Sequence, residues 1–132
     1  MKTTILVVDD EAETRILTQI FLESAGYTVI GAPDGIEALK LYERHRSGVA
    51  LLLTDVNMPH MNGFELADRL LLLRPDLPVL FMSGASHDAD RGFGCVPKPF
   101  RREELLIHVR KALCPPGPVC QARECEAQMQ NQ

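Results

Sequence analysis

The stretch Leu51-Leu52-Leu53-Thr54-Asp55-Val56-Asn57-Met58-Pro59 decides how this chain folds. Its apolar start has the length of a strand, and a proline turn closes it at once, which is typical of a strand buried on both faces of a sheet. Asp55 then stands at the carboxyl end of a central strand, where open α/β sheets bind their ligands. Asp55 is therefore a candidate site residue, although a strand can also end on an ordinary polar residue.

The composition fits one globular domain and narrows the choice of partners. The chain has 132 residues, of which 45% are hydrophobic, and its formal net charge of −4 argues against nucleic acid and anionic membranes as partners. The longest apolar runs are strand-sized and residues 1–8 do not form a signal peptide, so we expect a cytoplasmic protein. Four cysteines lack the spacing of a metal site and are expected to be free thiols: Cys95, Cys114, Cys120 and Cys125.

Apolar periodicity predicts strands that alternate with helices through residues 1–113. The first helix is indicated by apolar residues at helical spacing, and Gly26 is placed to close it. Asp34 is a candidate N-cap for the second helix. From Cys114 onward the chain is mostly polar and begins with a proline-rich run that breaks any helix, so residues 114–132 are predicted to be a mobile tail. The strands are expected at 5–8, 27–30, 51–55, 79–82 and 95–96, and the last helix at 101–113.

The alternation predicts right-handed crossovers and a parallel sheet covered on both faces. The fold class is α/β, a flavodoxin-like doubly wound five-stranded parallel sheet with strand order 2-1-3-4-5. This order brings Asp9 and Asp10, after the first strand, beside Asp55. Ser83 ends the fourth strand and Lys98 follows the fifth, at the same edge. The polar residues at the strand ends therefore converge on one crevice.

The three carboxylates of this crevice predict a cation site. Asp9, Asp10 and Asp55 would repel one another unless a cation joined them, and a donor set made only of oxygen suits Mg²⁺ or Mn²⁺. The main-chain carbonyl of Asn57 is a candidate further ligand. Since Mg²⁺ is usually held by one or two carboxylates together with phosphate oxygens, the site is expected to receive a phosphoryl group.

The remaining polar residues suit that group. Lys98 can contact it as a point charge and the Ser83 hydroxyl can donate to it, so Asp55 becomes a candidate nucleophile that forms an aspartyl-phosphate. Each residue also has an ordinary interpretation: acids favour a helix N-terminus, serine a turn, and lysine a solvated surface. Their joint occurrence after different strands, in the order that this fold requires, favours the site.

The chain resembles the receiver domains of two-component response regulators over about residues 3–113. Residues 51–84 are most similar to receivers attached to hybrid histidine kinases. The matching segments are VVDDE at 7–11, TDVNMPHMNG at 54–63, MSGA at 82–85 and KPF at 98–100.

This resemblance implies a role for each candidate residue. Asp55 would accept a phosphoryl group from a phosphohistidine on a sensor histidine kinase or a histidine phosphotransfer protein. Asp9 and Asp10 would form the acidic pocket, Ser83 would be the switch hydroxyl, and Lys98 the phosphate contact. The chain would be a monomer or weak dimer that catalyses only its own phosphorylation and dephosphorylation, rather than a turnover enzyme.

The sequence departs from the family's pattern between the fourth and fifth strands. Ser83 and Lys98 are only 15 positions apart (98 − 83), so the fourth helix is predicted to be missing or reduced to one turn. Cys95 stands where the family has its aromatic switch residue, and strand alternation puts Phe93 on the same face. The resemblance also implies a cis peptide bond before Pro99, which X-Pro bonds tolerate.

The leading interpretation is a phosphoacceptor, which could stand alone, act as a relay intermediate or be part of a hybrid kinase. Two other interpretations stay open. One is a degenerate receiver that binds partners without phosphate, which the altered switch region allows. The other is a Mg²⁺-dependent phosphatase that uses an aspartyl-phosphate. Such enzymes place their nucleophile first in a D-x-D pair after the first strand, a pattern that Asp9-x-Glu11 does not match.

Overall fold

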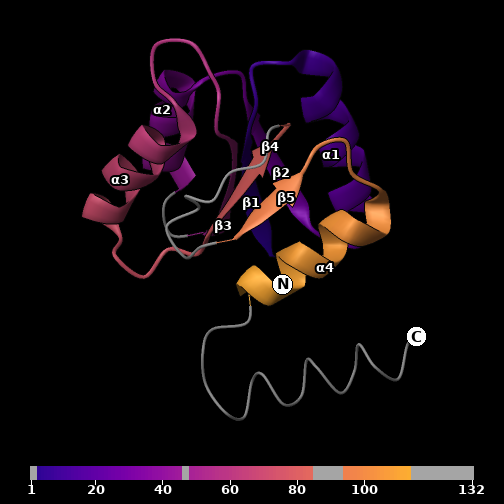
Figure 1. Cartoon of the computed structure of the whole chain (residues 1–132). Coiled ribbons are helices and arrows are strands. Elements are labelled where there is room, and N and C mark those ends of the chain that lie inside the picture. The colour runs from indigo at the N-terminus through magenta and orange to yellow at the C-terminus, as the bar shows by residue number, and fades with distance from the viewer. Residues whose placement is uncertain (1–2, 46–47, 85–93, 114–132) are drawn as a thin grey trace.

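A parallel sheet lies between two layers of helices in the computed structural model, which describes residues 3–45, 48–84 and 94–113 (Figure 1). The strands follow the order β2-β1-β3-β4-β5, which confirms the predicted doubly wound topology. Every neighbouring pair is parallel. The strands are β1 (Thr4–Val8), β2 (Thr28–Ala32), β3 (Val49–Asp55), β4 (Val79–Ser83) and β5 (Cys95–Pro97).

Two helices cover each face of the sheet. α2 and α3 pack on one face, and α1 and α4 on the other (Figure 1). The helices in the described part of the chain are α1 (Ala12–Ser24), α2 (Gly35–His45), α3 (Gly63–Leu73) and α4 (Arg102–Leu113). The predicted loss or reduction of a helix between β4 and β5 falls on residues 85–93, outside the described residues. The predicted tail at 114–132 lies outside them too.

Local signals in the sequence set the helix ends. Gly26, just after α1, has a φ of +97°, the left-handed conformation that a closing glycine adopts. Asp34 Oδ1 accepts a hydrogen bond of 2.8 Å from the main-chain N–H of Glu37, which confirms Asp34 as the cap of α2. Asn62 and Glu65 form a reciprocal capping box at α3, which fixes the turn between β3 and that helix.

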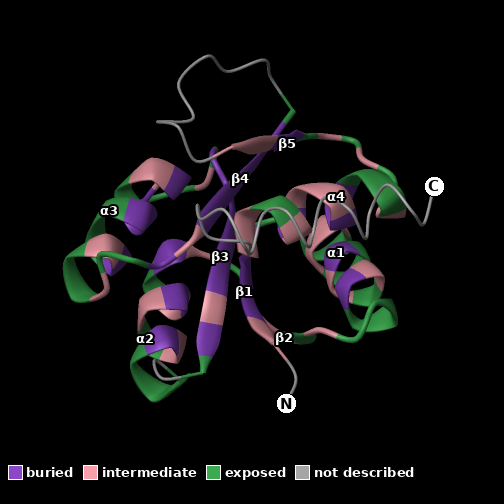
Figure 2. Cartoon of the chain, turned by 90° about the horizontal axis from the view of Figure 1, so that it is seen from below, coloured by how far each residue is buried: buried purple, intermediate pink, exposed green. Residues whose placement is uncertain are grey.

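The central strand is buried on both faces, as its apolar run predicted (Figure 2). Leu52 packs in the core under α2 and α3, whereas Leu51 and Leu53 pack in the core under α1 and α4. This alternation is the two-residue repeat of a strand between two apolar layers. Within the described ranges, no helix combines the length and apolarity needed to cross a membrane.

The buried face of α1 differs from the apolar spacing that predicted the helix. Thr18 and Leu22 are fully buried. The Thr18 hydroxyl donates to the carbonyl of Thr14 at 2.7 Å, so its polar group is satisfied within the helix and the side chain can enter the core. Three apolar side chains are left about half-exposed and together form the α1 strip: Ile16 (54%), Leu17 (45%) and Ile20 (55%).

Candidate functional site

Polar side chains gather at the carboxyl edge of the sheet. Asp9 directly follows β1 and Lys98 directly follows β5. Asp55 and Ser83 are the last residues of β3 and β4. The register of β3 with β4, and of β4 with β5, aligns these ends, and the main-chain N–H of Lys98 donates to the carbonyl of Ser83 at 2.8 Å.

The Lys98 ammonium contacts three carboxylates. Its Nζ lies 2.9 Å from Asp9 Oδ2, 3.3 Å from Asp55 Oδ2 and 3.8 Å from Glu11 Oε1. The Asp9 and Asp55 side chains are almost completely shielded from water, whereas Glu11 is 67% exposed, so its pair with Lys98 is the weak one. The structure thus brings together Asp9, Asp55 and Lys98, which the predicted strand order placed at one edge.

The acidic cluster has one member that sequence reasoning missed. Among the described residues, Asp9, Glu11 and Asp55 each carry a carboxylate oxygen within 4.8 Å of the others. Asp10, expected in this cluster, is exposed and does not belong to that group. The chain bends at Asp10, and the main-chain N–H of Glu11 donates to Asp9 Oδ1 at 3.0 Å. The sequence signal that could have included Glu11 is its place in the same acidic run, Asp9-Asp10-Glu11.

Burial and charge shift the pKa values of the central pair. Burial raises the pKa of Asp55, and the charge of Asp9 adds to this, while the charge of Lys98 opposes it. Burial alone would lower the pKa of Lys98, but the hydrogen bond to Asp9 and the charges of Asp9 and Asp55 outweigh it and raise that pKa. Lys98 therefore stays positively charged, whereas Asp55 holds a proton more readily than an exposed aspartate.

The other candidates border this pair. Ser83 is 1% exposed at the end of β4. Asn57 is exposed, and its main-chain N–H donates to the Asp55 carboxylate, which favours the charged form of Asp55. The peptide bond between Lys98 and Pro99 is cis, as the resemblance implied. Phe93 lies outside the described residues, and Cys95 is half-buried.

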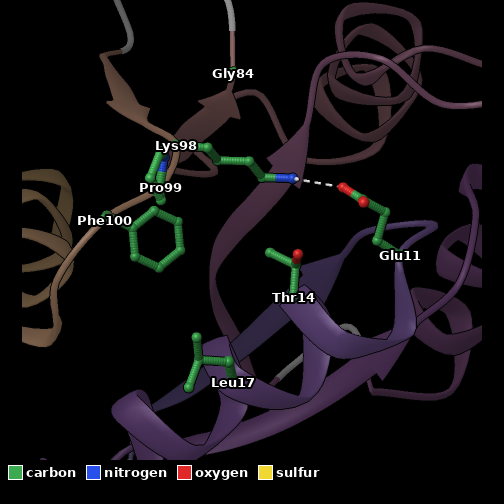
Figure 3. Close-up of a pocket in the computed structure, with 7 residues that line it drawn as sticks. All are labelled: Glu11, Thr14, Leu17, Gly84, Lys98, Pro99 and Phe100. Carbon is green, nitrogen blue, oxygen red and sulfur yellow. Dashed lines mark ion pairs between the residues drawn. The ribbon is translucent and has the colours of Figure 1, made fainter.

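A pocket of about 380 Å³ opens beside Lys98 (Figure 3). Glu11 and Lys98 point toward each other across one end of it, and Leu17 and Phe100 lie toward the other end (Figure 3). The site therefore has a charged side at the sheet edge and an apolar side that continues into the α1 strip through Leu17. The lining residues are Glu11, Thr14, Leu17, Gly84, Lys98, Pro99 and Phe100.

This donor set fits a hard divalent cation. Asp9, Glu11 and Asp55 offer only oxygen ligands, and one ammonium does not balance their three negative charges. Mg²⁺ and Mn²⁺ prefer such ligands. A buried carboxylate beside a lysine is also suited to accept a phosphoryl group, because the lysine can neutralise charge on the phosphoryl oxygens.

Comparisons with known proteins agree with this geometry. Residues 5–110 match the response regulator receiver domain. The sensor kinase CckA of Brucella abortus (strain 2308) is 38% identical over 117 residues, which are 83% of this chain but only 12% of the kinase. The response regulator receiver protein CpdR of the same organism is 37% identical over 121 residues, which cover 86% of this chain and 98% of CpdR.

A solved structure has a similar fold. The chemotaxis protein CheY4 of Vibrio cholerae aligns with a TM-score of 0.78 and 32% identity, over 86% of this chain and 100% of CheY4. Apart from Thr4, the family match covers all five strands, and it includes the strand ends that carry Asp9, Asp55, Ser83 and Lys98. The chain belongs to the receiver domains of two-component response regulators.

Proposed function

We propose that this chain is a cytoplasmic phosphoacceptor of a two-component phosphorelay. Asp55 receives a phosphoryl group, in a Mg²⁺-dependent reaction, from a phosphohistidine on a sensor histidine kinase or a histidine phosphotransfer protein. The observation that carries the proposal is the placement of the buried Asp55 carboxylate 3.3 Å from the Lys98 ammonium, beside the fully buried Asp9.

The transfer is a displacement at phosphorus. A carboxylate oxygen of Asp55 forms the new O–P bond, and the N–P bond to the partner's imidazole breaks, with its electron pair returning to the imidazole nitrogen. Lys98 would pair with the phosphoryl oxygens, and the Ser83 hydroxyl, one strand away, would donate to them. Water attack on the same phosphorus would later release inorganic phosphate, so the only chemistry is the chain's own phosphorylation and dephosphorylation.

The carboxylates supply the cation ligands. Mg²⁺, or Mn²⁺ in its place, would neutralise the charge that the phosphoryl group brings to an already acidic site. Asp9 and Asp55 would hold it together with the main-chain carbonyl of Asn57. Asp10, expected from the sequence, and Glu11, present in the described cluster, are competing candidates for a further ligand.

Two single variants separate these candidates. Asp10→Asn and Glu11→Gln each remove one negative charge without changing the size of the side chain. The variant of the true ligand is expected to weaken Mg²⁺ binding about tenfold, while the other stays within about twofold. Equal, small effects of both variants would show that Asp9 and Asp55 are the only side-chain ligands.

The α1 strip is the surface that we propose for the phosphodonor. The partner must bring its imidazole to the mouth of the site, and Leu17 both lines the pocket beside Lys98 and belongs to the strip. Apolar side chains that are about half-exposed in the free chain would then become covered during transfer. A negative net charge disfavours nucleic acid as the alternative partner.

Intact mass after incubation with acetyl phosphate tests the function directly. We expect one added phosphoryl group that needs Mg²⁺ and that is absent from Asp55→Asn. A chelator should abolish the adduct in the wild-type chain. If the chain binds Mg²⁺ but takes up no phosphoryl group, either from acetyl phosphate or from phosphorylated histidine kinases, the degenerate receiver replaces this proposal.

A further inference from the structure

Arg15 is a half-buried cation of α1 that contacts the site and, within the described part of the chain, forms no ion pair with a carboxylate. Its Nη1 donates a hydrogen bond of 2.7 Å to the main-chain carbonyl of Asp9. We propose that Arg15 is a positioning residue, which orients Asp9 and thereby sets the affinity of the site for its divalent cation. This inference rests on the proposed role of Asp9 as a cation ligand.

The hydrogen bonds of Asp9 show why one donor matters. Asp9 is fully buried, and its main-chain N–H donates to the carbonyl of Ala32 at 3.1 Å. Its Oδ1 accepts from the main-chain N–H of Glu11 at 3.0 Å, and its Oδ2 accepts from Lys98 Nζ at 2.9 Å. Arg15 supplies the partner of the Asp9 carbonyl, so the main-chain donor and all three oxygens of Asp9 are paired, each with a different residue.

The fold holds Arg15 in place by packing as well as by this bond. A Cβ built on Gly31 would lie 3.6 Å from Arg15 Cδ and 3.8 Å from its Cγ, so the aliphatic stem of Arg15 runs over the bare backbone of β2. The main-chain N–H of Arg15 donates to the carbonyl of Glu11 at 3.0 Å, within the first turn of α1. The helix therefore fixes the main chain of Arg15, and packing over Gly31 fixes its aliphatic stem, so the guanidinium is held at the end of β1.

The position of the Asp9 carbonyl sets the course of the chain beyond β1. This carbonyl lies in the planar peptide that joins Asp9 to Asp10, so fixing it also fixes the direction in which the next residues leave the strand. Without Arg15, the buried carbonyl would lose its donor, and the peptide would be free to turn toward other donors or water. The Oδ atoms of Asp9 and the carboxylate of Glu11 would then move relative to Asp55, which lies on a different strand.

The Arg15 guanidinium does not compete with a metal ion for the carboxylate oxygens. It bonds to the carbonyl side of Asp9, so it leaves the carboxylate oxygens of Asp9 and Asp55 to Lys98 and to a metal ion. Donors of this outer kind orient the groups that touch a metal, and their removal typically weakens metal binding about 10- to 100-fold. The expected change here is at the lower end, because three other hydrogen bonds still hold Asp9.

A titration with Mg²⁺, monitored by NMR chemical shifts of the unphosphorylated chain, tests this role. Arg15→Met keeps the apolar stem over Gly31 and removes the guanidinium. It is expected to raise the Mg²⁺ dissociation constant about tenfold. The rate of phosphorylation by acetyl phosphate should fall by a similar factor at low Mg²⁺ and recover at saturating Mg²⁺, a split that a loss of stability alone would not produce.

Arg74→Met is the matched control. Arg74 is likewise half-buried and donates through Nη1 to a main-chain carbonyl, that of Val49 at the opposite end of β3. It is expected to lower the unfolding midpoint while leaving the Mg²⁺ dissociation constant within about twofold of wild type. The inference is overturned if Arg15→Met binds Mg²⁺ like the wild type, or if both variants weaken Mg²⁺ binding equally.

Arg15→Lys keeps the test decisive if the methionine variant does not fold. It retains the charge but loses the planar fork, and a weakening of about threefold or more is expected because the shorter reach leaves the carbonyl poorly paired. An unchanged dissociation constant would overturn the inference. A wild-type chain that binds Mg²⁺ but takes no phosphoryl group would overturn the proposed function alone, and the ratio of Mg²⁺ affinities would still decide the role of Arg15.

Discussion

Gly63→Ala should destabilise the protein by displacing the main chain of Asp55, although Gly63 itself is not a site residue. Gly63 is the first residue of α3, and its backbone passes directly against the end of β3. A Cβ at this position would lie 2.3 Å from the main-chain oxygen of Asp55 and 3.1 Å from both the Asp55 carbonyl carbon and Val56 Cα. All three are backbone atoms, so no side chain can rotate away to relieve the contact.

The size of the effect can be worked out from these distances. The Asp55 oxygen would have to retreat by about 0.7 Å to reach 3.0 Å, the limit below which real Cβ contacts essentially do not occur. That movement strains the 2.8 Å hydrogen bond from the Gly63 N–H to the Val56 carbonyl. Overpacking costs about 1–3 kcal/mol and a weakened bond about 1 kcal/mol, while the better helix propensity of alanine returns up to about 1 kcal/mol. With the full propensity gain, the net loss should be about 1–3 kcal/mol.

Urea unfolding of three alanine variants measures this loss against matched controls. Among the described residues, no atom lies within 4 Å of the Cβ that Gly84→Ala would add, so this variant should change the free energy of unfolding by less than about 0.5 kcal/mol. Gly35→Ala meets Met61 Sδ at 2.7 Å, the far end of a flexible side chain, and should fall between the other two. The reasoning is refuted if Gly63→Ala is no less stable than Gly84→Ala.

Three further results are expected. In the metal-free chain the pKa of Asp55 is raised, so its contribution to stability is present below the ordinary carboxyl pKa and is lost as the pH rises through the raised pKa. Asp55→Asn should therefore become more stable relative to wild type as the pH rises. A stability difference that does not change with pH in urea unfolding would contradict this. Lys98→Met leaves buried carboxylates without their cation and should cost about 3 kcal/mol in chelator, a loss that Mg²⁺ partly restores in thermal unfolding. Ile20→Glu should slow transfer from a cognate kinase about tenfold but not from acetyl phosphate, whereas Leu72→Glu, at a site 84% exposed on α3, should change neither rate.

The edge that carries the site was predictable because backbone topology decides it. In a parallel sheet, strand order and right-handed crossovers fix which strand ends are neighbours, whatever the side chains in between. Asp9, Asp55, Ser83 and Lys98 were therefore placed at one edge from the apolar runs and the doubly wound strand order, and the structure places the strand ends there. The prediction needed no knowledge of any single contact.

The buried face of α1 was not predictable in the same way. Apolar spacing weighs Ile16, Leu17 and Ile20 as core residues and Thr18 as a polar one. The Thr18 hydroxyl, however, is satisfied by the carbonyl one turn earlier, so burying this side chain costs little. Whether a threonine side chain can be buried thus depends on a hydrogen bond that the residue type alone does not reveal. With Thr18 facing the core, the apolar side chains of the α1 strip face outward.

The role of Arg15 was not predicted from the sequence, but an argument about hydrogen bonds could have found it. A cation five residues after Asp10 carries no periodic or motif signal, since its role depends on reach across elements rather than on spacing. The need to pair every buried main-chain group does carry a signal. When a buried residue such as Asp9 directly follows a strand, its carbonyl lies beyond the hydrogen bonds of the sheet and needs another donor. The next helix starts within a few residues, so a long donor on its first turns is the nearest candidate. Applied here, that requirement selects Arg15, because it is the first side chain after Asp9 that carries a nitrogen donor.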